Sequence, residues 1–284
     1  MSQEAIYERR GDLFFPTKWA GSPWSAGLQH GGPLNALFAR SAELAAQQVG
    51  LQVARLTVDL FKPVPTEPLA CRTRFARRGR RIANLEIEFS LEGEETPLSK
   101  ATAVLLMRRD DLTRTPAPER PPAPSLEDLQ ASPFMPKSLG ASFPPGFHFS
   151  LEIGFGRDPL GAFASIHTPL DLVAGEPITP LQHSAAVADL TFGLSMRLQA
   201  GGAGFATDSS RVPMINTDTS IQWERPPVGD RIFFRESRIS DEAGIGLASV
   251  SLYDELGRLG LSTQVLLAQQ GFGGSNASSE TGSR

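Results

Sequence analysis

Hydrophobic and polar residues follow the same pattern in two separate parts of the chain. Residues 90–106 align with residues 251–267 without a gap, and residues 57–63 align with residues 220–226. In each part, a stretch rich in small apolar residues precedes the alternating segments. This repeated order predicts two copies of one unit, each with a helix followed by several strands.

The first copy is predicted to combine one helix with four strands. Apolar residues recur at helical spacing after Pro33, a residue that suits the first turn of a helix. Because many of them are small, we expect this helix to lie close against a sheet. Apolar and polar residues then alternate in four segments with short antiparallel connections, at 56–61, 70–76, 84–91 and 101–107.

The second copy repeats this plan. Thr179 and Pro180 suit the cap and the first turn of a helix that we expect to run to about Met196. A glycine-rich insertion at 201–204 separates this helix from the later strands. The predicted strands are 147–155 and 162–167 before the helix, then 213–224, 230–238, 244–253 and 259–268 after it.

A proline-rich stretch separates the two copies. Nine prolines lie between residues 116 and 145, and because proline lacks a backbone donor we expect neither a sheet nor a long helix there. The end of the chain is rich in Gly, Ser, Asn and Thr, which predicts disorder. The expected organisation is an N-terminal domain, a surface connector, a C-terminal domain and a disordered tail, at 1–112, 113–145, 146–270 and 271–284.

The predicted fold class is α+β, with a curved antiparallel sheet wrapped around one helix in each copy. A lone sheet of this kind leaves an edge strand exposed, and joining two sheets side by side covers that edge. Sheet faces that stay exposed favour further association, so a homo-oligomer is one expectation.

Composition narrows the class of protein. Hydrophobic residues make up 40% of the chain and charged residues 20%, as in soluble globular proteins. The net charge of -4 gives no basic field, so we expect no nucleic-acid partner. Without a leader-like start or an apolar run near the ~20 residues of a membrane span, we expect a cytoplasmic location and no membrane association. The single cysteine, Cys71, suits a small buried position better than a nucleophile.

Polar chemistry is concentrated in the second copy. Three aliphatic positions of the first copy have polar counterparts in the second, namely Ala42 against Asp189, Val53 against Asn216, and Ala103 against Gln264. This difference predicts one active site in a paired scaffold.

Each of these polar residues also has a structural interpretation. Asp189 has apolar neighbours and can act as a base or orient water, or it can face solvent or bind a backbone amide. Asn216 can orient water or belong to a turn, and Asp218 can be a structural hydrogen-bond acceptor. Gln264 is either a pocket residue or a satisfied interior group.

The start of the first helix offers a second kind of chemistry. At Gly31 and Gly32, free backbone N–H groups at the positive end of a helix can stabilise an oxyanion, and the alternative is a tight turn. His30, just before them, is interpreted as a loop histidine beside the substrate rather than a base. His183, in the second helix, is interpreted as structural.

Arg78 and Arg80 lie in a predicted hairpin turn with four arginines. Such a turn is usually solvated, and the alternative is contact with a phosphorylated ligand such as coenzyme A. Motifs typical of a P-loop, a zinc protease, a paired Cys-x-x-Cys site or a serine hydrolase do not occur, so metal and serine-nucleophile chemistry are poorly supported.

Several motifs occur in an order shared with one known family. They are Gly175 to Gln182 leading to Asp189, Asn216-Thr217-Asp218 leading to Glu224-Arg225-Pro226, and Asp254 to Gly260 leading to Gln264, with His30 to Pro33 and Arg78 to Arg80 in the first copy. In these motifs the chain resembles the acyl-CoA thioesterase II family of double hot-dog proteins.

The resemblance implies a double hot-dog fold and hydrolysis of a fatty or small acyl-CoA thioester. It implies no metal or other cofactor, because coenzyme A is part of the substrate. By resemblance, Asp189, Asn216 and Gln264 hold the hydrolytic water. Asn216 departs from the family, whose better-known members have a hydroxyl there, and Gln264 is one residue closer to Gly257 than in those members.

Two other functions stay open. A non-catalytic acyl-CoA-binding or lipid-binding protein would keep the same scaffold, and Asn216 is the feature in its favour. A hot-dog hydratase or dehydratase has less support, because those enzymes use an Asp followed closely by a His, whereas His183 precedes Asp189. The length and type of the acyl chain are not predicted.

Overall fold

The computed structural model describes residues 4–112, 120–127, 129–132, 143–201 and 213–269. The predicted tail at 271–284 and most of the glycine-rich insertion lie outside these residues. Parts of the proline-rich connector also lie outside them.

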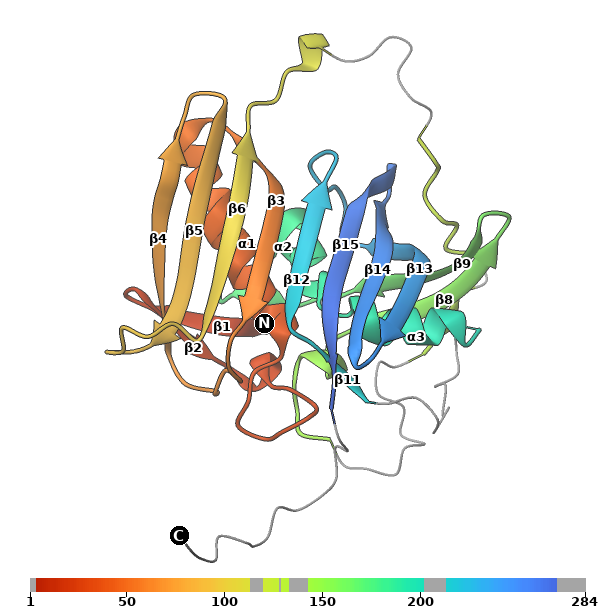
Figure 1. Cartoon of the computed structure of the whole chain (residues 1–284), viewed down its shortest axis with the longest axis horizontal. Helices are drawn as coiled ribbons and strands as arrows, with labels where there is room; N and C mark the ends of the chain where they lie inside the picture. Colours follow the sequence, from red (N-terminus) through yellow and green to blue (C-terminus); the bar gives the residue numbers. More distant parts are fainter. Residues whose placement is uncertain (1–3, 113–119, 128, 133–142, 202–212, 270–284) are drawn as a thin grey trace, which may run out of the picture.

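The described strands belong to one sheet that runs across the whole molecule (Figure 1). In the order of their hydrogen-bonded neighbours they are β10 (Asp171–Val173), β1 (Ala5–Arg10), β2 (Leu13–Pro16), β4 (Leu69–Arg78), β5 (Ile82–Leu91), β6 (Ser99–Leu106), β3 (Gln52–Leu60), β12 (Asp218–Trp223), β15 (Gly257–Ala268), β14 (Ile245–Asp254), β13 (Ile232–Glu242), β9 (Gly161–His167), β8 (Glu152–Asp158) and β7 (Gln130–Ala131). A further short strand, β11 (Met214–Asn216), pairs with β15.

The two copies meet at the antiparallel pair formed by β3 and β12. Thr57 lies opposite Ser220, which is its own counterpart in the repeat, and their hydroxyl oxygens are 2.8 Å apart. An approximate two-fold axis therefore passes through this pair. The expected arrangement, two helix-wrapped antiparallel sheets joined side by side, is confirmed.

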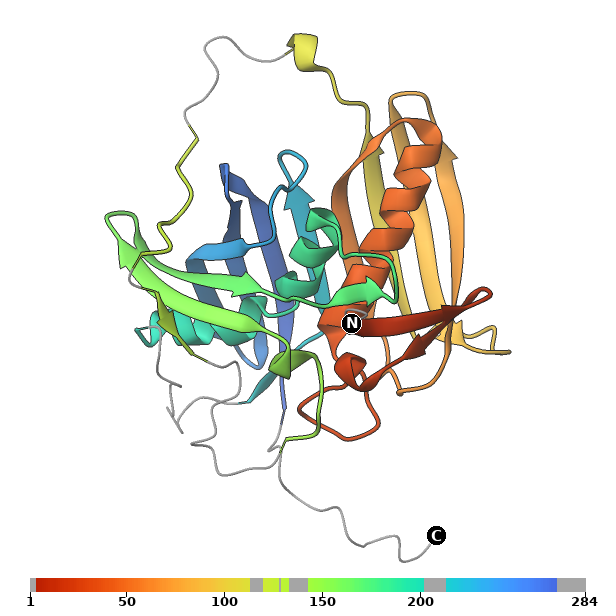
Figure 2. The same cartoon turned by 180° about the vertical axis from the view of Figure 1, so that it is seen from behind.

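The α-helices lie on one side of this sheet (Figure 2). They are α1 (Gly31–Val49), α2 (Pro180–Ala188) and α3 (Thr191–Gln199), and short 3-10 helices occur at η1 (Lys18–Ala20), η2 (Asp110–Leu112) and η4 (Phe147–Phe149). The α1 helix packs against both the sheet and α2. Glycine allows the close approach of the two helices, because a Cβ atom on Gly32 would lie 2.7 Å from the carbonyl oxygen of Ala186.

The segment predicted as a strand at 147–155 begins its strand only at Glu152. Phe147–Phe149 form the 3-10 helix η4 instead, and the Phe147 N–H donates to the carbonyl oxygen of Gly21 over 3.1 Å. This contact with a distant loop turns the chain away from the sheet. A strand at Ala5–Arg10, which the pattern analysis did not predict, lies at the start of the first copy.

The connector was expected to contain no sheet, and this expectation is wrong at one place. Gln130 and Ala131 form β7, where Gln130 lies opposite Phe155 of β8. Neither of these two residues is a proline, so both have a backbone N–H and can pair.

Candidate active site

The helix predicted to run from Pro180 to Met196 is interrupted at Asp189. The α2 helix ends at Ala188 with Asp189 as its C-cap, and α3 starts at Thr191. The prediction of one continuous helix is therefore wrong. The break leaves backbone groups unpaired within the helix, and they need partners from elsewhere.

The side chain of Gln264 on β15 supplies these partners. Its Nε2 atom donates to the carbonyl oxygen of Asp189 and to Oγ1 of Thr219, each over 3.0 Å, and its Oε1 atom accepts from the N–H of Phe192 over 2.8 Å. Gln264 is fully buried. It therefore fixes the backbone that carries Asp189, and both of its amide hydrogens are used within the protein.

The carboxylate of Asp189 lies between the two copies. Its Oδ1 atom accepts a hydrogen bond from Nδ2 of Asn216 over 3.1 Å, and its Oδ2 atom lies 3.0 Å from Nδ1 of His30. A Cβ atom on Gly31 would lie 2.5 Å from Oδ1, so the carboxylate is packed directly against the first residue of α1. The Asp189 side chain is only 7% exposed.

His30 is the N-cap of α1, and the same ring nitrogen has two neighbours. Its Nδ1 atom lies 3.0 Å from the N–H nitrogen of Gly32 and 3.0 Å from Oδ2 of Asp189. An unprotonated Nδ1 accepts from Gly32, whereas a protonated Nδ1 donates to Asp189. The side chain is 7% exposed, so His30 is a buried group at the helix start rather than a residue of a solvated loop.

His148 is a neighbour of this site that the sequence patterns did not indicate. It lies in η4 and is 2% exposed, and Phe147 beside it contacts the His30 ring with centroids 5.4 Å apart. Burial, followed by the nearby charge of His30, lowers the pKa of His148 to about 4. What brings His148 here is the packing of Gly146, where a Cβ atom would lie 2.1 Å from the Gly21 carbonyl oxygen, and the sequence alone does not indicate this contact.

Asp218 and Cys71 each make a contact that suits a structural role. The Oδ1 atom of Asp218 accepts from the N–H of Val265 over 2.7 Å, and burial raises the pKa of this carboxyl. Cys71 is partly buried, and its Sγ atom lies 3.4 Å from the hydroxyl of Ser41. Burial raises the pKa of this thiol, as suits a packing residue.

The structure does not bring the arginine turn to this site. Arg78 and Arg80 lie at the turn between β4 and β5, at the end of the sheet opposite to the start of α1 (Figures 1 and 2). The expected site residues that do come together are Asp189, Asn216, Gln264, His30, Gly31 and Gly32.

Within the described parts of the chain, no cluster of three or more His, Cys, Asp or Glu side chains is arranged to hold a metal ion. None of the helices described is both long enough and apolar enough to cross a membrane.

Among solved structures, the similar ones share the fold at low sequence identity. A conserved protein of unknown function with a hot dog fold from Alicyclobacillus acidocaldarius has a TM-score of 0.64 at 16% identity, over 93% of this chain and 96% of its own. The tesB protein of Mycobacterium avium subsp. paratuberculosis has a TM-score of 0.60 at 15% identity, over 93% and 96%. A trans-AT PKS dehydratase domain from Brevibacillus brevis has a TM-score of 0.54 at 13% identity, over 94% and 98%.

Family models match both halves of the sequence. The acyl-CoA thioesterase N-terminal domain matches residues 20–106, and the acyl-CoA thioesterase C-terminal domain matches residues 112–268. No curated protein matches the sequence. The fold is thus the expected double hot-dog, and the chain belongs to the acyl-CoA thioesterase family.

Proposed function

We propose that this protein hydrolyses the thioester of a fatty or small acyl-CoA, with Asp189 as the base. The observation that carries the proposal is the buried Asp189 carboxylate, which lies between the amide of Asn216 and the first residues of α1. A carboxylate held in this way can take a proton from a water molecule that lies beside the substrate carbonyl. Among the residues that the structure describes, the side-chain oxygen of Asn216 has no hydrogen-bond partner, so it can orient that water.

The reaction balances with these groups alone. As Asp189 takes a proton from water, the remaining oxygen bonds to the thioester carbon and the carbonyl oxygen becomes an oxyanion. The backbone N–H of Gly31 lies at the positive end of α1 and stabilises that charge. The expected free N–H of Gly32 donates to Nδ1 of His30 instead, so it can join the oxyanion site only when that nitrogen turns to Asp189. The C–S bond then breaks, and the departing thiolate receives the proton from Asp189, which gives a carboxylic acid and free coenzyme A.

We assign Gln264 a positioning role in this reaction. The water was expected to have three side-chain ligands, but both hydrogens of the Gln264 amide have partners within the protein. The support for this role is the bond from Nε2 to the Asp189 carbonyl oxygen, which sets where the helix ends. Gln264 thus acts on the carboxylate through the backbone.

Contact between His30 and Asp189 favours a second candidate, a hydratase or dehydratase. The sequence order argued against it because no histidine follows Asp189, yet His30 reaches Asp189 from the other copy. A histidine base at the α-carbon and an acid at the leaving hydroxyl would suffice for that chemistry. A third candidate, acyl-CoA or lipid binding without turnover, is favoured by the low exposure of the Asp189 carboxylate.

One panel of substrates separates these candidates. Purified protein is given saturated acyl-CoAs and 3-hydroxyacyl-CoAs of several lengths, while free thiol and enoyl-CoA are measured in parallel. Release of thiol from the saturated substrates supports the hydrolase. Enoyl-CoA formed without thiol would select the dehydratase, and saturable binding without either product would select the binding protein.

We further propose that the protein acts in the cytoplasm without a resident cofactor or metal, on free acyl-CoA. The division into two domains, 1–112 and 146–270, with 113–145 as connector stays a prediction; the matched C-terminal family domain extends over the connector, from residue 112 to residue 268. A role for Arg78 and Arg80 in binding the phosphates of coenzyme A, and assembly into a homo-oligomer, stay predictions.

A further inference from the structure

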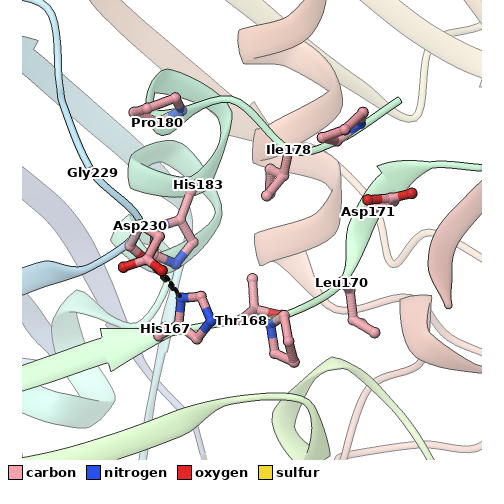
Figure 3. A pocket seen from close by; sticks show the side chains of 11 residues that line it. His167, Thr168, Leu170, Asp171, Ile178, Pro180, His183, Gly229 and Asp230 are labelled. Atoms are coloured by element: carbon pink, nitrogen blue, oxygen red, sulfur yellow. Dashed lines mark hydrogen bonds and ion pairs between the residues drawn. The ribbon is translucent and has the colours of Figure 1, made fainter. Parts of the chain in front are cut away.

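A pocket separate from the candidate active site lies at the N-terminal end of α2, at the opposite end of that helix from Asp189 (Figure 3). Its volume is about 280 Å³. Three segments line it, namely residues 167–171 between β9 and β10, residues 177–183 at the start of α2, and residues 229–230 before β13. The proposed hydrolysis uses none of them.

Two buried polar side chains in this pocket have unmet hydrogen-bonding capacity. The Oδ1 atom of Asp171 is buried and has no hydrogen-bond partner among the described residues, and the residue is 6% exposed. His183 is 2% exposed, and neither of its ring nitrogens has a described partner. Leaving such groups unpaired in the interior is unfavourable, and more so for a charge, so both point to a missing partner.

The chemistry of the lining is mainly that of hydrogen-bond acceptors. Nδ1 of His167 lies 2.7 Å from the carbonyl oxygen of Asp230 and must donate to it, which leaves Nε2 for a ligand, as an acceptor when it carries no proton. Burial lowers the pKa of His183 to about 3, so this ring is neutral and offers one donor and one acceptor. The lining therefore offers three acceptor groups, one each on His167, His183 and Asp171, and a single donor, on His183. Figure 3 shows Asp171 across the pocket from the two histidines.

Apart from Thr168, the remaining walls are mainly apolar, and they include Leu170, Ile178 and Pro180. A suitable ligand therefore has a short aliphatic body and several hydrogen-bond donors. The carboxylates of Asp171 and Asp230 favour a positive charge and oppose an anion. The volume limits the ligand to a size below that of a typical drug-sized molecule.

We propose that this pocket binds a small aliphatic ammonium ion that also carries a hydroxyl group. The ammonium group donates to the Asp171 carboxylate, and the hydroxyl bonds with His183 and His167. This binding site is independent of the proposed hydrolysis, because neither the ligand nor the residues enter that reaction.

The test measures binding of 4-aminobutan-1-ol to the full chain by calorimetry and by NMR of the histidine rings. Butane-1,4-diol, which lacks the charge, and 4-hydroxybutyrate, which has the opposite charge, are the matched probes. We expect saturable binding of the amino alcohol that is about tenfold or more tighter than that of the diol, and none of the anion. Equal affinity for the diol, preference for the anion, or no saturable binding would each overturn the proposal.

Variants locate the site. Asp171→Asn should lower the affinity for the amino alcohol by about tenfold or more, while the affinity for the diol should stay within about twofold of wild type. The matched control is Asp12→Asn, because the carboxylate of Asp12 is fully exposed. This variant should change neither of the two affinities. If Asp171→Asn does not fold, Ile178→Trp, which fills the pocket, should abolish binding. Unchanged affinity in a folded pocket variant would contradict the assignment.

Discussion

Nδ1 of His30, in the first copy, lies 3.0 Å from Oδ2 of Asp189, in the second. The contact joins the start of α1 to the end of α2, so a site whose polar residues were predicted from one copy is completed by the other. It also ties the protonation of His30 to the hydrogen bonding of Gly32, because both neighbours compete for one nitrogen.

Replacing His30 separates its role as the N-cap of α1 from its contact with the Asp189 carboxylate. In His30→Asn, the short amide can still accept from the N–H of Gly32, so the start of α1 and the melting temperature should change little. The contact between Nδ1 of His30 and Oδ2 of Asp189, which helps to hold the carboxylate in place, is lost, and we expect kcat/KM for acyl-CoA hydrolysis to fall at least about tenfold. Activity equal to that of wild type would show that His30 only caps the helix.

Gly31→Ala tests the packing of the carboxylate. The new Cβ atom would lie 2.5 Å from Oδ1 of Asp189, so that carboxylate must move. A displacement of about 1 Å is enough to reduce kcat by about a hundredfold, while alanine in a first turn is tolerated by the helix.

The contrasting variant is Gly32→Ala, whose Cβ atom would meet the backbone carbonyl of Ala186 at 2.7 Å. There we expect a lower melting temperature, since backbone moves less readily than a side chain. Steady-state kinetics and thermal unfolding of both variants check this pair. A Gly31→Ala enzyme with undiminished kcat would refute the contact.

Gln264→Leu removes the side chain that holds the break between α2 and α3. The Phe192 N–H, the Asp189 carbonyl and the Thr219 hydroxyl all lose a partner, so the free energy of unfolding should fall by about 2–4 kcal/mol. We expect kcat to fall as well, because the end of α2 is no longer fixed. Gln264→Glu keeps the acceptor for Phe192 but sets a second oxygen against the Asp189 carbonyl oxygen in a fully buried position, so it should recover neither quantity. Urea unfolding that is unchanged in Gln264→Leu would exclude this positioning role.

Stability should depend on pH through His183. Its pKa is lowered from 6.5 to about 3 in the folded protein, mainly by burial, so the unfolded chain binds the proton more tightly. The stabilisation is complete above about pH 6.5 and is lost as the pH falls towards 3, by up to about 1.4 kcal/mol per pH unit. His183→Phe should flatten the pH dependence measured by urea unfolding between pH 7 and pH 4.5. An identical slope in the variant would rule out this contribution.

The repeat could be predicted from sequence because the alternation of apolar and polar side chains is a local property of each strand, whichever strand it pairs with. Alternation marks each strand, and the alignment of the two copies predicted that Thr57 and Ser220 are counterparts, which the pairing of β3 with β12 confirms. Polar residues at aliphatic counterpart positions also indicated Asp189 and Asn216, which are in contact.

Other features depend on distant contacts and leave little signal along the chain. The helix break at Asp189 is fixed by Gln264, which is 75 residues away, and the local pattern around Asp189 continues to favour a helix. His148 reaches the site because Gly146 packs against Gly21. The residues around each glycine give no indication of this contact.

Asp189→Asn is the most direct test of the proposed hydrolysis. The amide keeps the size of the carboxylate but cannot take a proton from water, so the fold should persist, as circular dichroism and thermal unfolding would verify. Free thiol is then followed with the best acyl-CoA substrate, with Asp12→Asn as the exposed control. We predict that Asp189→Asn lowers kcat by about 10²–10⁴-fold while the control is unaffected. Thiol release at the wild-type rate by folded Asp189→Asn would contradict the assignment of Asp189 as the base.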